Sequence, residues 1–116
     1  MPYDETLADR TRSIIARTES DVEEKRMFGG ICFMVNGKMC VGVKSDRMMV
    51  RFDPALTDEI MEKNGVGPMD FTKRTLKGFA FVEIEVLATD KELEYWVALA
   101  LDFNKRAKPA RKKRSQ

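Results

Sequence analysis

The sequence predicts an α+β domain in which helices flank an antiparallel sheet, in the order α-βββ-α-ββ-α. Apolar residues repeat at helical spacing near both ends of the chain and at alternating spacing between them. The pair Asn36-Gly37 separates two short apolar runs, and Asn-Gly is the strongest short-range signal of a β-hairpin. The 116 residues are enough for one compact domain. We place this domain at residues 1–104 and a tail at 105–116.

The first helix is expected over residues 4–17. Leu7, Thr11 and Ile15 lie on one face of it, four residues apart, which is a narrow apolar stripe. Asp4 is a suitable N-cap, because its side chain can accept from the free N–H groups of the first turn. The next segment, 18–25, is polar and charged and is expected to be a loop.

Three strands are expected next, at 28–35, 38–44 and 48–52, as an antiparallel meander. A type I′ turn at Asn36-Gly37 requires positive φ at both residues, which Asn and Gly tolerate best. With a regular two-residue turn, Phe33 would face Cys40.

Asp53-Pro54 begins the second helix, with Asp as N-cap and Pro in the first turn, and Asn64-Gly65 ends it. The stretch from Gly65 to Pro68 is expected to be a loop. The last strands are expected at 71–72 and 78–86.

In the strand at 78–86, the even-numbered residues are expected to face the core. Phe79 and Phe81 then lie on the other face and need a cover, either a helix or a partner chain. Thr89 and Glu92 form a capping box that begins the last helix, whose apolar side is expected to seal the sheet. Trp96 lies on that side, as a core residue or a dimer anchor.

The tail contains seven basic residues and no acid, whereas residues 1–104 carry a net charge of −5. It lacks apolar residues to bury and is expected to be disordered. Such a tail either contacts nucleic-acid phosphates without reading sequence or only keeps the protein in solution. The residues concerned are Lys105, Arg106, Lys108, Arg111, Lys112, Lys113 and Arg114.

The composition excludes several kinds of active site. Histidine is absent, so a Ser-His-Asp triad, a Cys-His pair and a histidine-ligated zinc site are excluded. Cys32 and Cys40 are expected on opposite faces as buried free thiols, not as a redox pair. We predict no catalytic, cofactor-binding or metal-binding residue. The carboxylates Asp70, Glu83 and Glu85 are better explained as a solvated surface than as a catalytic or metal site, and an enzyme using Asp70, Lys77 or Arg51 ranks last.

Gly29-Gly30 is interpreted as a bulge or close backbone approach, not as a phosphate-binding turn, because it lacks the glycine spacing of nucleotide loops and enters a strand. The N-terminus carries no signal-peptide core, and the longest apolar runs fall far short of a membrane span. The expected location is cytoplasmic, without membrane contact.

Several short motifs, in this order and spacing, resemble the TfoX N-terminal domain family. The resemblance covers about residues 3–105 and includes Lys25-Arg-Met-Phe-Gly-Gly30, Met39–Val43, Met48–Arg51, Pro68–Thr72 and Lys77–Phe79. The residues that carry it are Met27, Phe28, Gly29, Gly30, Asn36, Gly37, Pro68, Asp70, Phe71, Lys77 and Gly78.

The resemblance implies a secretion-chaperone-like α+β fold of the YgaC/TfoX-N type. Named family members, also called Sxy, are competence regulators that act with a cyclic-AMP receptor protein and have a second, helical domain; this chain resembles the short single-domain members. It implies no catalytic residues. We therefore expect a non-enzymatic, regulatory protein-interaction module without a cofactor, forming a homodimer, with Phe79, Phe81 and Trp96 as interface residues. The alternative is a nucleic-acid-associated accessory protein that uses the basic tail.

Overall fold

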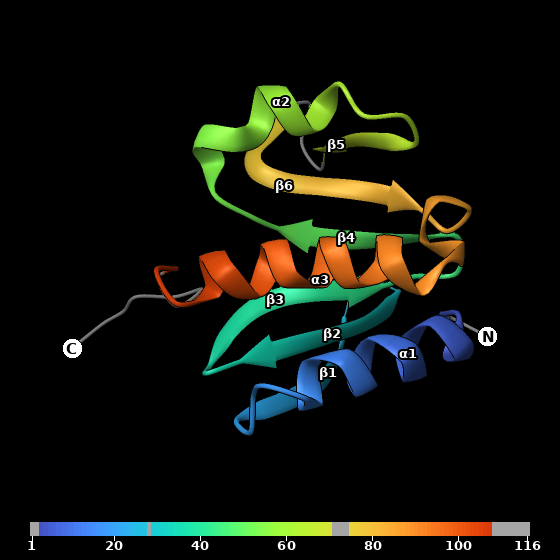
Figure 1. The fold of residues 1–116 in the computed structure, drawn as a ribbon, viewed down its shortest axis with the longest axis vertical. Helices are drawn as coiled ribbons and strands as arrows, with labels where there is room; N and C mark the ends of the chain where they lie inside the picture. Colours follow the sequence, from blue (N-terminus) through green and yellow to red (C-terminus); the bar gives the residue numbers. More distant parts are fainter. Residues whose placement is uncertain (1–2, 28, 71–74, 108–116) are drawn as a thin grey trace.

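The computed structural model describes residues 3–27, 29–70 and 75–107 (Figure 1). Within these residues six strands form one antiparallel sheet in the order β1-β2-β3-β4-β6-β5. The elements in chain order are α1 (Glu5–Ala16), β1 (Val22–Met27), β2 (Gly30–Val35), β3 (Lys38–Val43), β4 (Arg47–Arg51), the 3-10 turn η1 (Pro54–Leu56), α2 (Thr57–Met61), β5 (Val66–Asp70), β6 (Thr75–Glu83), the 3-10 turn η2 (Val86–Ala88) and α3 (Asp90–Asn104).

The α+β class is confirmed, with one strand more than predicted. The segment 18–25 was expected to be a loop, but β1 pairs with β2 from Val22 to Met27, so the order is α-ββββ-α-ββ-α. Charged residues are typical of an edge strand, where they discourage pairing with other chains. In β1, Glu24 forms a bidentate ion pair with Arg12 of α1, with Nε–Oε2 and Nη2–Oε1 distances of 2.5 and 2.8 Å. Because four of its six residues are charged, β1 lacks the alternating apolar pattern by which a strand is predicted from sequence.

The prediction of a loop from Gly65 to Pro68 is wrong. Val66–Asp70 form β5, which pairs with β6 at the other edge of the sheet. A proline is acceptable there, because the free side of an edge strand requires no N–H donor. Gly65 has φ +77°, but α2 already ends at Met61 with Glu62 as its C-cap, so the helix stops before the predicted Asn64-Gly65. Phe71 and Thr72 lie outside the described residues.

The predicted N-caps are confirmed for all three helical segments. Asp4 Oδ1 accepts from the N–H of Leu7 at 2.8 Å, and Thr89 Oγ1 accepts from that of Glu92 at 3.2 Å. Asp53 Oδ1 accepts from the N–H of Ala55 at 3.0 Å, where the chain forms η1 before α2 begins.

The core lies between the sheet and the helices α1 and α3, which cover the same face of the sheet (Figure 1). Ala80 and Val82 of β6 are fully buried, which confirms the core face predicted for this strand. Ile84 and Val86 lie beyond the strand end but still pack against the core. The fully buried large side chains include Leu7, Ile15, Phe33, Phe52, Met48, Leu93 and Trp96.

The hairpin turn is confirmed, but its register is not. Asn36 and Gly37 have φ 55° and 78°, as a type I′ turn requires. An irregularity between Phe33 and Met34 shifts the pairing, so that Phe33 faces Val41 and Cys32 faces Gly42. A β-bulge of this kind adds one residue to one strand, so counting residue pairs outward from the turn does not reveal it.

The folded part continues slightly past α3. Asn104 is buried, and its Nδ2 donates to the carbonyl of Val35 at 3.1 Å, which holds the end of α3 against the hairpin. Arg106 donates to Asp53 at 3.2 Å, and Ala107 is buried. The structure thus places residues up to Ala107 on the body of the domain. No helix within the described residues has the length and apolar content needed to span a bilayer.

Candidate functional site

The sheet has one face that the helices of the described residues do not cover. The buried apolar residues of α1, α2 and α3 all belong to the main core, on the side of the sheet where α1 and α3 lie (Figure 1). A second apolar cluster contains only residues that lie in strands, and we call its surface the open face. Its buried members are Cys32, Met34 and Met49, and its half-buried members are Met27, Met39, Phe79 and Phe81.

Phe79 and Phe81 lie on the open face, as the alternation in β6 predicted. The expected cover was a helix or a partner chain, but cations of the same chain lie over both rings. The Cζ atom of Arg47 is 4.0 Å from the centre of the Phe81 ring, and that of Arg51 is 5.7 Å from the Phe79 ring. Lys44 Nζ lies 5.5 Å from Phe81. A guanidinium over an aromatic face is attracted by the ring quadrupole, and the two rings are consequently half-buried, not exposed.

Sequence reasoning missed these cations, although β4 carries a usable signal. Arg47, Met49 and Arg51 alternate along β4, so all three side chains lie on one face. The register places Arg51 opposite Phe79 and Met49 opposite Phe81. Without the sheet order, however, nothing indicates that β4 neighbours β6.

Cations outnumber carboxylates on the open face. The register adds Lys25, which is opposite Cys32, and the carboxylates Glu23 and Glu83, which are opposite Met34 and Arg47. The charged residues placed there by pairing or by ring contacts are Lys25, Lys44, Arg47, Arg51, Glu23 and Glu83. Burial lowers the pKa of Arg51 below its ordinary value, so a carboxylate brought to this site would interact favourably with a partly desolvated cation.

The glycines of the family motif allow close backbone contacts and positive φ angles that other residues would not. A Cβ on Gly30 would lie 2.2 Å from the carbonyl oxygen of Val43, which confirms the predicted close approach. Gly78 has φ +85°, and its N–H donates to Thr57 Oγ1 at 3.0 Å. Gly29 also has positive φ. Pro68 and Asp70 lie in β5, Lys77 is exposed in β6, and Phe28 and Phe71 lie outside the described residues.

Trp96 is a core residue, which is one of the two roles expected for it. It is 1% exposed and packs in the core, because it lies on the apolar side of α3 together with Leu93 and Val97. Its neighbour Tyr95 is 43% exposed and makes an edge contact with the Trp96 ring, with 5.2 Å between ring centres.

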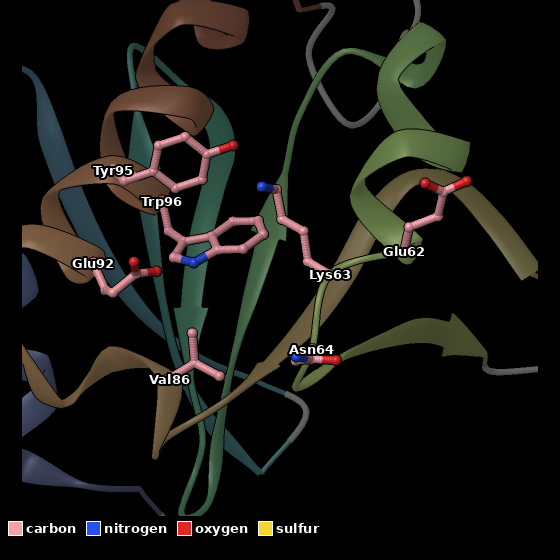
Figure 2. A pocket seen from close by; sticks show the side chains of 7 residues that line it. All are labelled: Glu62, Lys63, Asn64, Val86, Glu92, Tyr95 and Trp96. Atoms are coloured by element: carbon pink, nitrogen blue, oxygen red, sulfur yellow. The ribbon is translucent and has the colours of Figure 1, made fainter.

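Trp96 also lines an open cavity of about 440 Å³ between the end of α2 and the start of α3 (Figure 2). Lys63 lies over the Tyr95 ring at 5.3 Å, and the buried Trp96 Nε1 has no hydrogen-bond partner within the described part of the chain. The lining residues are Glu62, Lys63, Asn64, Val86, Glu92, Tyr95 and Trp96.

The carboxylates considered from the sequence are not gathered by the described structure. Glu83 and Glu85 are exposed, and the side chain of Asp70 lies outside the described part. Arg51 lies on the open face and Lys77 is exposed on β6, and neither lines the cavity beside Trp96. Where the structure describes the chain, it contains no group of three Cys, Asp or Glu side chains placed to hold a metal ion.

The two thiols lie on opposite faces and are buried, as predicted. Cys40 belongs to the main core and Cys32 to the cluster of the open face. Burial raises the pKa of Cys32 to about 11 and that of Cys40 to about 12. Because the thiolate is the nucleophile, neither is a reactive cysteine near neutral pH.

The predicted tail divides at residue 107. Lys105 caps α3, and Arg106 pairs with Asp53 and Asp102 at 3.2 and 3.5 Å. The remaining predicted phosphate contacts, Lys108, Arg111, Lys112, Lys113 and Arg114, lie outside the described residues.

Comparison with known proteins gives one match. The model of the family described as TfoX N-terminal domain matches residues 15–104. No curated protein and no solved structure shows significant similarity to the chain.

Proposed function

Since the chain belongs to the TfoX N-terminal domain family, we propose that it is a non-enzymatic, regulatory protein-interaction module that binds its partner on the open face. The observation that carries the proposal is a sheet face of Met, Cys and Phe side chains that no helix of the described residues covers. Domains of this kind normally bury both faces of a sheet or expose one that is polar. An apolar face of this kind is therefore suited to an interaction.

The side chains of the open face suit a protein segment better than a small molecule. Met27 and Met39 are unbranched and polarizable, so they adapt to partners of different shape. Phe79 and Phe81 supply aromatic area, and Arg47 and Arg51 supply planar donors beside it. Aromatic residues, Met and Arg are the types enriched at protein interfaces.

The charge on the open face favours a partner of complementary charge. Four cations and two carboxylates are placed there by pairing or ring contacts. We propose a partner segment with carboxylates interspersed among apolar side chains, because complementary charge favours association and correct orientation. The same charge disfavours pairing of this face with itself. The homodimer remains a prediction for another surface, which sedimentation at high protein concentration tests.

Charge reversal tests the proposal. Lys25→Glu and Arg47→Glu each change the open face, and Arg17→Glu makes the same change on an exposed residue of the helix-covered side. We expect the wild type and Arg17→Glu to retain the same acidic partner in affinity capture from cells, and the other two variants to lose it. Equal retention by all four proteins, each with an unchanged melting curve, would refute the assignment of this face.

A second candidate function is nucleic-acid association through the tail, favoured by its charge alone. With Arg106 engaged by Asp53 and Asp102, five basic residues remain beyond Ala107. Five phosphate contacts on duplex DNA would give a slope of log affinity against log salt of about −4.5. Deletion of residues 108–116 should then abolish binding at low salt, and unchanged binding by the truncated chain would remove this candidate.

A further inference from the structure

Three sulfur-containing side chains pack together beneath the open face. Cys32 and Met34 are two residues apart in β2, so both side chains lie on the same side of the sheet. Cys32 Sγ and Met34 Sδ are 3.9 Å apart. Met49 of β4 packs in the same cluster, although β3 separates its strand from β2.

Gly42 of β3 allows Met49 to reach the other two. Gly42 lies directly opposite Cys32 on one side and Met49 on the other. A Cβ on Gly42 would lie 3.5 Å from the terminal methyl carbon of Met49. The thioether end of Met49 therefore occupies the space above the glycine, between β4 and Cys32.

We propose that Cys32, Met34 and Met49 form a binding site for a soft monovalent metal ion, Cu(I) or Ag(I). Thiolate and thioether sulfur are soft ligands that select Cu(I) over hard ions. Three sulfurs around one ion at about 2.3 Å, the usual length of a metal–thiolate bond, would be about 4 Å apart. The observed Cys32–Met34 separation of 3.9 Å matches this arrangement before any metal is present.

The surroundings favour the same class of ion. Cys32, Met34 and Met49 are 3%, 8% and 5% exposed, so the site is shielded from water. The chain contains no histidine, and the register places Lys25 opposite Cys32 and a single carboxylate, Glu23, opposite Met34, which is too few oxygen ligands for a hard ion. Zn²⁺ prefers four Cys, His or carboxylate ligands, and Mg²⁺ and Ca²⁺ prefer oxygen, so these ions are disfavoured.

Binding involves no change of oxidation state. The S–H bond of Cys32 breaks, its proton passes to solvent, and a sulfur–metal bond forms, while the thioethers of Met34 and Met49 donate lone pairs. The metal remains monovalent throughout. This inference is independent of the proposed protein partner, because it depends only on side chains within one chain.

Titration of the full-length protein with Ag(I), and with Cu(I) in competition with a chromophoric Cu(I) chelator, tests the site. We expect one equivalent to bind the wild type and an unchanged result for Cys40→Ala, whose thiol lies on the other face. Cys32→Ser should abolish this binding. Met34→Leu and Met49→Leu, which keep the side-chain volume, should each weaken it about tenfold or more, corresponding to about 1.4 kcal/mol.

Four results would contradict the proposed metal site. Binding that survives Cys32→Ser, that is unaffected when both methionines are leucine, or that is lost in Cys40→Ala would overturn the proposal, as would no binding to the wild type. Tryptophan fluorescence of each variant establishes that it is folded, because the single Trp96 lies in the core away from these sulfurs.

Discussion

Replacement of Gly30 by alanine should destabilise the domain severely. The new Cβ would lie 2.2 Å from the carbonyl oxygen of Val43 and 3.1 Å from its carbon. Both atoms belong to the backbone of β3, so no side-chain rotation can relieve the overlap. The first residue of β2 must instead move away from β3.

The magnitude follows from the sheet geometry. Relief requires a displacement of about 1 Å, which exceeds the roughly 0.5 Å range of N–H···O distances in good hydrogen bonds. At least one backbone hydrogen bond at this end of the β2–β3 ladder would then be lost or badly strained. An unsatisfied buried backbone group costs about 1–3 kcal/mol, and overpacking about the same, so we expect a loss of roughly 2–5 kcal/mol.

Urea unfolding followed by Trp96 fluorescence measures this loss against two matched glycines. A Cβ on Gly67, in the edge strand β5, would meet nothing within 4 Å, and its φ lies outside the left-handed region, so alanine there should change the stability by about 0.5 kcal/mol or less. Gly37→Ala also has open space, but its φ of +78° should cost about 1 kcal/mol. A Gly30→Ala variant as stable as Gly67→Ala would refute the close-approach reasoning.

Three further predictions concern the rest of the domain. Asn104→Ala removes the hydrogen bond to the Val35 carbonyl and should lower the free energy of unfolding by about 1–3 kcal/mol, measured by urea unfolding; an unchanged value would contradict the role of Asn104 as a clamp. Thr89→Ala removes the N-cap of α3 and should cost about 1 kcal/mol, whereas Thr89→Ser should cost much less. Burial raises the pKa of Cys40 to about 12, above its unfolded value near 9. The contribution of the protonated thiol to the free energy of unfolding is therefore fully present below about pH 9 and decreases as the pH rises towards 12. From pH 9 to 10 the stability should therefore fall by about 1 kcal/mol more in the wild type than in Cys40→Ala, because the unfolded thiol is already half ionised at pH 9, and parallel curves would disprove this.

The sequence was sufficient for the features that depend on local chemistry. The N-caps Asp4, Asp53 and Thr89 and the type I′ turn at Asn36-Gly37 are short-range signals, and the structure confirms all of them. The core face of β6 followed from strict alternation of apolar residues.

The two missed strands are both edges of the sheet. β1 carries charged residues and β5 contains Gly67 and Pro68, so neither shows the apolar alternation of a central strand. Both edge strands obtain their stability from backbone pairing to the next strand along the chain, β1 to β2 and β5 to β6. Propensity alone does not contain this information.

The candidate site was predictable only in part. Alternation placed Phe79 and Phe81 off the core face, but the cations over their rings depend on the order β4-β6-β5. The bulge between Phe33 and Met34 likewise changed which residues face each other across the hairpin. Burial of Trp96 depends on how completely α3 is covered by the sheet, which periodicity does not decide.

The central claim is that the open face is the surface that binds a protein partner. A photo-crosslinking amino acid placed at Lys25, which is exposed on that face, tests it directly against the same amino acid at Ser13, which is exposed on α1. We predict that irradiation in cells yields a discrete adduct with a carboxylate-rich protein segment from position 25 and none from position 13. Adducts from position 13 alone, or only nucleic-acid adducts or second copies of the chain at position 25, would contradict it.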